Sequence, residues 1–174
     1  MTQPLYTVRQ LAYVVRDMDA ALKYWIEVLK VGPFFMIEHA ALENQKFFGK
    51  PSNTDVSIAL GNSGDLQIEV IYQHNDEPSV YKEFLDAGRV GVHHFGLMPE
   101  DYEATCEQYK ALGHEAAFEC TIGGVPLVYF DTVKTVGHYI ELWDNHSLFK
   151  EMFLMVEEAA KGWDGKDPIR PWQV

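Results

Sequence analysis

The chain has 174 residues, of which 47% are hydrophobic and 13% aromatic, so it can bury a sizeable core in one domain or two small modules. Its net charge of −12 disfavours nucleic-acid and anionic-membrane partners, because phosphate-rich surfaces demand a basic patch. No apolar run approaches the roughly 20 residues of a membrane span. Residues 1–5 lack the basic and apolar segments of a signal peptide, so we expect a cytoplasmic protein.

The first part of the chain reads as one strand, one helix and three further strands. Residues 7–16 are almost continuously apolar and β-prone, which predicts a strand covered on both faces. Asp17 is a candidate N-cap for a helix with a core-facing stripe at helical spacing. The stripe comprises Met18, Ala21, Leu22, Trp25 and Leu29. Strands are predicted at residues 34–39, 55–60 and 66–72, a loop at 44–53 and a tight turn at 61–65.

The second half of the chain repeats this order. Its predicted elements are a strand at 92–98, a helix at 102–112, and strands at 115–121, 125–131 and 138–143. The fold class is therefore α+β, with two tandem βαβββ modules that form a curved, half-barrel-like sheet around a metal site. We divide the chain into a first module (1–75), a linker with a short helix (76–90), a second module (91–145), and a C-terminal helix and tail (146–174).

Four polar side chains occupy matched strand positions in the two modules. They are Gln10, Glu69, His94 and Glu141. Glutamate is disfavoured in strands and costly to bury without a partner, so two at matched positions favour a ligand role. If the two sheets face each other, the four groups offer one imidazole nitrogen and three oxygens. Such a set suits Zn, Ni, Co, Mn or Mg, with coordination positions left for water or substrate.

The other histidines fit no such pattern. His93 should point to the strand face opposite His94, in a structural role. The remaining five match no ligand spacing and are treated as structural or solvent-facing: His39, His74, His114, His138 and His146. Cys106 and Cys120 are expected to be buried, reduced thiols.

Several weak motifs, taken in order, carry a family resemblance. Gln10 precedes Asp17 by seven residues, as His94 precedes Asp101, and Ile-Glu recurs in the last strand of each module. With the run Gly-Arg-Val-Gly-Val-His-His-Phe at 88–95, most of residues 7–145 resembles the vicinal-oxygen-chelate superfamily of glyoxalases, bleomycin-resistance proteins and extradiol dioxygenases. The run at 88–95 is similar to methylmalonyl-CoA epimerases, which usually carry His and Gln in place of Gln10 and Glu69.

The resemblance implies metal ligands at the same four positions, in the set typical of eukaryotic-type glyoxalase I. We therefore expect a divalent-metal-dependent lyase, isomerase or epimerase that abstracts a proton next to the chelated carbonyl of a hydrophobic substrate. Glu141 is the first candidate base, because the corresponding ligand in glyoxalase I can leave the metal. Glu38 is the second, since it falls near a proposed epimerase base. The aromatic residues expected to line the pocket are Phe34, Phe35, Phe47, Phe48 and Tyr129.

The sequence leaves two alternative functions open and also predicts a partner subunit. The chain could instead be a non-catalytic small-molecule-binding protein of the drug-resistance type. An extradiol-type dioxygenase is less favoured, because only one of the four ligand positions is a histidine. The predicted helix at 147–160 has a broad apolar stripe that covers either a core edge or a partner subunit. Together with the pairing of modules in the superfamily, this stripe leads us to expect a homodimer.

Overall fold

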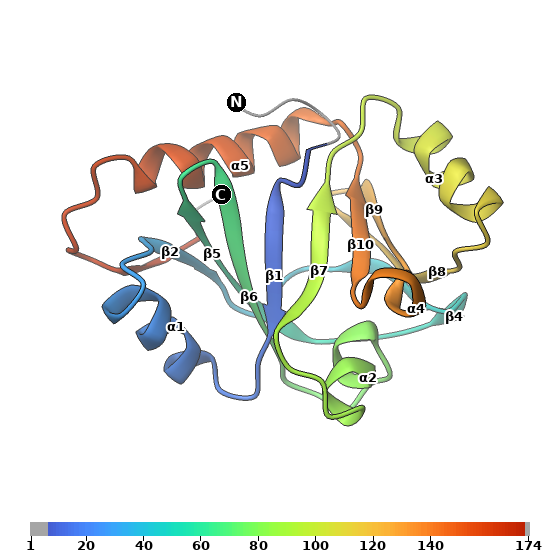
Figure 1. Ribbon diagram of the computed structural model, residues 1–174, viewed down its shortest axis with the longest axis horizontal. Helices are drawn as coiled ribbons and strands as arrows, with labels where there is room; N and C mark the ends of the chain where they lie inside the picture. The colour runs from blue at the N-terminus through green and yellow to red at the C-terminus, as the bar shows by residue number, and fades with distance from the viewer. Residues whose placement is uncertain (1–6, 173–174) are drawn as a thin grey trace.

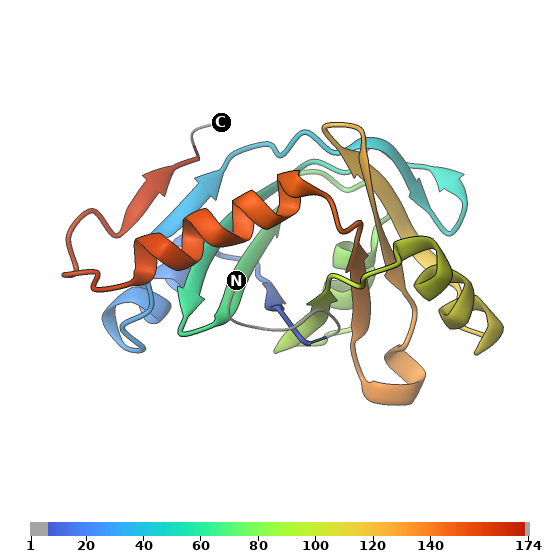
Figure 2. The same ribbon diagram turned by 90° about the horizontal axis from the view of Figure 1, so that it is seen from above.

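The computed structural model describes residues 7–172, and its strands form one strongly curved mixed sheet (Figures 1 and 2). The strands are β1 (Gln10–Val14), β2 (Phe34–Ile37), β3 (Glu43–Phe47), β4 (Lys50–Pro51), β5 (Val56–Ser63), β6 (Leu66–Gln73), β7 (Val92–Leu97), β8 (Ala116–Ile122), β9 (Val125–Phe130), β10 (Tyr139–Trp143) and β11 (Ile169–Pro171). The helices are α1 (Met18–Glu27), α2 (Val80–Asp86), α3 (Tyr102–Ala111), α4 (Val133–Val136) and α5 (Ser147–Ala160).

The sheet order displays the duplication. Strands run β11-β2-β5-β6-β1-β7-β10-β9-β8-β3-β4 across the sheet. The halves β2-β5-β6-β1 and β7-β10-β9-β8 contain the same unit, with its strands in reversed order across the sheet. In each half the strand that comes first in the chain pairs in parallel with the strand that comes last. The two halves meet where β1 and β7 pair antiparallel at the centre of Figure 1. The predicted fold of two βαβββ modules with an added C-terminal helix is confirmed.

The two long module helices start in the same way. Asp17 accepts a hydrogen bond from the Ala20 amide and Asp101 accepts one from the Ala104 amide, each at 2.9 Å, as N-caps do. Helix α1 places Leu22 against the outer face of the first module. It ends at Glu27, so Leu29 lies beyond the helix and is 44% exposed, which corrects its assignment to the apolar stripe.

The prediction of a loop at residues 44–53 is wrong. This segment forms the hairpin β3–β4, and β3 pairs antiparallel with β8 of the other module, with Phe47 opposite Phe118. Figure 2 shows the hairpin reaching across the molecule to extend the far edge of the sheet. Strand β3 has mostly exposed side chains and lacks the alternation of apolar residues that marks a strand in sequence, and its pairing partner β8 lies about 70 residues away.

Helix α5 begins and ends where the sequence predicted, and it covers the core of its own chain. Phe149 and Phe153 pack against Trp143, with ring centroids 6.5 and 5.0 Å apart, and Val156 is fully buried beside them. The helix therefore lies over the sheet of the first module in Figure 2. In the tail that follows, β11 pairs in parallel with β2. Across residues 7–172 no helix is long and apolar enough to cross a membrane.

The contact between Gly96 and Trp143 gives a prediction about stability. A Cβ at Gly96 would overlap the Trp143 ring, so Gly96→Ala forces the core under α5 to shift. We expect it to lower the free energy of unfolding in urea by roughly 1–3 kcal/mol or more, the usual cost of overpacking. The double variant with Trp143→Leu should show less than the sum of the two single effects. Full additivity would contradict the proposed steric origin.

Candidate metal centre

The pairing of β1 with β7 brings the four candidate ligands together. Gln10 and His94 come from these two central strands, while Glu69 and Glu141 come from β6 and β10, which flank them. In the register, Ala12 lies opposite both Glu69 and His94, and Gly96 lies opposite both Gln10 and Glu141. Strands that run side by side thus direct all four side chains to one point inside the curved sheet.

His94 Nε2 lies at the centre of this group. It is 3.2 Å from Glu69 Oε2, 3.1 Å from Glu141 Oε2 and 3.3 Å from Gln10 Oε1. The site is closed to solvent, and the exposed fractions are 3% for Gln10, 7% for Glu69, 0% for His94 and 4% for Glu141. One imidazole nitrogen therefore faces three oxygens in a dry environment.

The electrostatics of the site follow from burying two carboxylates beside one imidazole. Burial opposes the charged imidazolium, but the charges and hydrogen bonds of Glu141 and Glu69 prevail and raise the pKa of His94 to about 9. Burial also raises the pKa of Glu69, against the opposing effect of His94. Two carboxylates thus share a dry site with one imidazole, and an excess of negative charge there is costly in the interior.

His93 holds the His94 ring from behind. The sequence predicted His93 on the strand face opposite His94, and this is wrong. The register between β1 and β7 shifts at this point, so His93 turns toward His94. Its Nδ1 lies 2.9 Å from His94 Nδ1, and its Nε2 lies 3.1 Å from the Val80 carbonyl. Burial and the charge of His94 lower the pKa of His93. Neutral His93 therefore donates to Val80 from Nε2 and accepts at Nδ1 from His94, which leaves His94 Nε2 for the carboxylates.

The donor set fits a divalent cation. The candidate ligand atoms of Glu69, His94 and Glu141 all lie within 4.8 Å of one another. Among residues 7–172, no hydrogen-bond donor aligns with Glu69 Oε2, although it lies within ion-pair distance of His94. A cation bound to His94 Nε2 in place of the proton would neutralise the excess charge and satisfy this oxygen. Gln10 is oriented in turn by Gln67, whose Oε1 accepts from Gln10 Nε2 at 2.7 Å.

Other predicted site residues lie elsewhere. Glu38 is exposed just beyond β2, where it lines a hollow with Met36 and the start of α1, and the structure does not bring it to the four. Phe34 faces the α1 cluster and is not a pocket liner. Tyr129 does lie at the site, with its ring edge-on to His94 at 4.9 Å. Phe47 and Phe48 line a different hollow, beside α2.

The sequence reasoning missed two supporting residues, His93 and Gln67. His93 was placed on the wrong face because a β-bulge interrupts the alternation of β7. Gln67 precedes Glu69 by two residues on β6 and so shares its strand face, which was a usable signal. The two cysteines are free and buried, as expected.

Comparison with known proteins places the chain in a family. Residues 9–125 match the model of the Glyoxalase/Bleomycin resistance protein/Dioxygenase superfamily, over more than half of the chain. The chain belongs to this superfamily. The comparison with curated proteins found no matching sequence.

Several solved structures of other proteins share the fold. A hypothetical protein from Bacillus halodurans C-125 is similar with a TM-score of 0.58 at 15% identity, covering 80% of this chain and 94% of that one. Methylmalonyl-CoA epimerase from Mycobacterium tuberculosis gives 0.57 at 15% identity, covering 87% and 95%. Another methylmalonyl-CoA epimerase gives 0.51 at 20% identity, covering 83% and 99%. At these identities the likeness establishes the fold and not the activity.

The role of His93 in this superfamily member can be tested by stability. His93→Leu leaves His94 Nδ1 without its partner in the core and removes the imidazole from the Val80 carbonyl, which keeps its bond within α2, so we expect the free energy of unfolding to fall by about 1–3 kcal/mol. His114→Leu is the matched control, because the His114 ring also bonds a backbone carbonyl, that of Asp131, but is half-buried. Equal losses in urea unfolding would contradict the role assigned to His93.

Proposed function

We propose that this superfamily member is a divalent-metal-dependent lyase, isomerase or epimerase that removes a proton next to a carbonyl of a hydrophobic substrate. The observation that supports it most is the convergence of four donors on one buried point. Gln10, Glu69, His94 and Glu141 would hold the ion, which we expect to be Zn, Ni, Co, Mn or Mg. A bound divalent cation would supply Lewis-acid polarisation of the substrate carbonyl.

The protein's own groups provide the rest of the chemistry. We assign the proton transfer to Glu141, by its resemblance to the ligand that leaves the metal in glyoxalase I. A carboxylate in this position needs to gain and lose a proton beside a substrate C–H, which is general base and then general acid chemistry. Its neighbour Glu69 has a similar burial and a similar distance to His94. Glu69 therefore serves as an internal control for the assignment.

The surroundings of the site support a substrate with apolar character. Tyr129 contacts His94, and its hydroxyl accepts a hydrogen bond from Tyr81 at 3.1 Å. Phe118 packs against both tyrosine rings. These aromatic groups would exclude water and strengthen every electrostatic interaction at the site. One solved epimerase of this fold is described in complex with methylmalonyl-CoA, so acyl thioesters form one class of carbonyl compound to test.

Metal binding is the first prediction of this proposal. Protein stripped with a chelator should bind a divalent cation at the buried centre and then unfold at a higher temperature. When the free cation concentration is 100 times the dissociation constant, the free energy of unfolding should rise by about 2.7 kcal/mol. His94→Ala and Glu69→Ala should each abolish this tight binding, as measured by calorimetry. Binding that is absent in the wild-type protein would favour the alternative of a non-catalytic small-molecule-binding protein.

Proton exchange tests the base. With a panel of acyl thioesters and 2-oxoaldehyde adducts in deuterated water, we expect the wild-type protein to exchange a substrate C–H, followed by NMR. Glu141→Gln should lower this rate by roughly 10²–10⁴-fold while metal is retained at saturating concentration. Glu69→Gln should lower it much less under the same conditions. Unchanged exchange in Glu141→Gln would refute its role, and oxygen uptake with iron(II) and a catechol would instead favour the dioxygenase.

The homodimer stays a prediction. Because the apolar stripe of α5 is largely buried within its own chain, the expectation now depends on the superfamily resemblance alone. Light scattering of the purified protein should give twice the chain mass. A monomeric mass at micromolar concentration would contradict it.

A further inference from the structure

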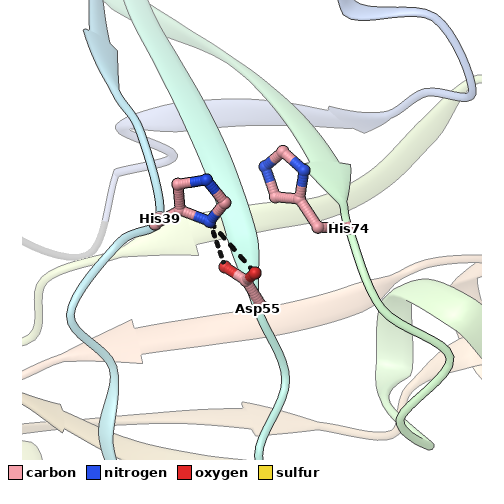
Figure 3. Close-up of side chains that lie close together, drawn as sticks. All are labelled: His39, Asp55 and His74. Carbon is pink, nitrogen blue, oxygen red and sulfur yellow. Dashed lines mark hydrogen bonds and ion pairs between the residues drawn. The ribbon is translucent and has the colours of Figure 1, made fainter.

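A second cluster of metal-binding side chains lies at one end of the first module, away from the buried centre. His39 follows β2, Asp55 precedes β5 and His74 follows β6. Because β2, β5 and β6 are neighbours that alternate in direction, these three strand ends lie next to one another at the same end of the sheet. Figure 3 shows His39 bonded to the Asp55 carboxylate, with the His74 ring beside the His39 ring.

The distances are those of a nearly assembled site. His39 Nδ1 lies 2.8 and 3.0 Å from the two Asp55 oxygens, and the rings of His39 and His74 stack with centroids 4.4 Å apart. One ligand atom from each of the three residues lies within 4.8 Å of the others. Donors that share one ion at about 2.0–2.2 Å lie about 3–4 Å apart. Both histidines are exposed, so rotation of their side chains can adjust these separations when an ion binds.

The backbone beneath the cluster is fixed by the sheet. The His74 amide donates to the Asp55 carbonyl at 2.8 Å, and the His39 amide donates to the Ser57 hydroxyl oxygen at 3.2 Å. The same Ser57 hydroxyl lies 2.7 Å from His74 Nε2. The three ligand-bearing positions therefore have little freedom to separate, which lowers the entropic cost of binding an ion.

The surroundings favour a cation. The hollow beside His74 and Ser57 is lined by three carboxylates, those of Asp17, Asp19 and Glu38, with Arg16 as a single opposing charge. An acidic hollow on a protein with a net charge of −12 raises the local concentration of cations. The exposed Glu38 therefore lies in the acidic hollow that His74 also lines.

We propose that His39, Asp55 and His74 form a second divalent-cation site at the protein surface, distinct from the buried centre. Two imidazoles and one carboxylate select borderline ions such as Zn²⁺ over Mg²⁺ and Ca²⁺, which prefer all-oxygen sites. Three protein ligands leave a coordination position open to water. A bound ion would link the ends of β2, β5 and β6.

Stoichiometry tests the site. Protein without an affinity tag, stripped with a chelator, is dialysed against Zn²⁺ and analysed for metal. We expect two ions per wild-type chain and one for the variant His39→Asn/His74→Asn. The matched control His114→Asn, a half-buried histidine outside both clusters, should keep two. Two ions retained by His39→Asn/His74→Asn would overturn the proposal.

A second pair of variants separates this site from the buried centre. Glu69→Gln/His94→Asn should keep one ion, and adding His39→Asn/His74→Asn to it should remove that ion. The first of these outcomes can hold even if the buried centre binds nothing, so the two proposals can fail separately. Asp55→Asn, followed by histidine ring resonances in NMR during Zn²⁺ addition, gives a check in a variant with both imidazoles present. Resonances of His39 and His74 that do not respond in the wild-type protein would also overturn the proposal.

Discussion

The antiparallel pairing of β1 with β7 is the constraint on which the rest of the structure depends. Each module by itself carries two of the four donors, and neither pair could enclose an ion alone. Joining the central strands places Gln10 beside His94 and brings Glu69 and Glu141 in from the two sides. The same pairing includes the register shift that turns His93 inward, so the orientation of the central imidazole is also set at this seam.

Burying the four polar groups where β1 pairs with β7 costs free energy, which indicates that the site binds a ligand. Two carboxylates and a fully buried imidazole occupy the dry interior, where hydrophobic residues of similar volume would often be as stabilising or more so. Two neighbouring polar groups orient the donors: Gln67 bonds Gln10, and His93 bonds His94. Such an arrangement is expected where perturbed charges serve a binding or catalytic site and not stability alone.

The buried centre between the modules and the surface cluster of the first module contrast in burial and therefore in chemistry. At the buried centre the protein has removed water, so charge that develops on a substrate would interact strongly with the site. At the surface cluster the two histidines are in contact with solvent, and only the strand ends beneath them are rigid. An ion there would be held by few ligands and exchange readily, which suits a structural or regulatory role more than the chemical step.

The sequence by itself predicted the cap at Asp17 and helix α5, because each depends on spacing within one element. It also predicted the duplication and the four candidate donors, because the same pattern recurs in the second half of the chain. It did not reveal the β3–β4 hairpin or the inward turn of His93, because both arise from pairing between segments distant in the chain. His39 and His74 carried no signal, since 35 residues separate two side chains that only adjacent strand ends bring together. Spacing along the chain records what one element presents, whereas contacts between elements are decided by register, and only the tertiary structure sets that.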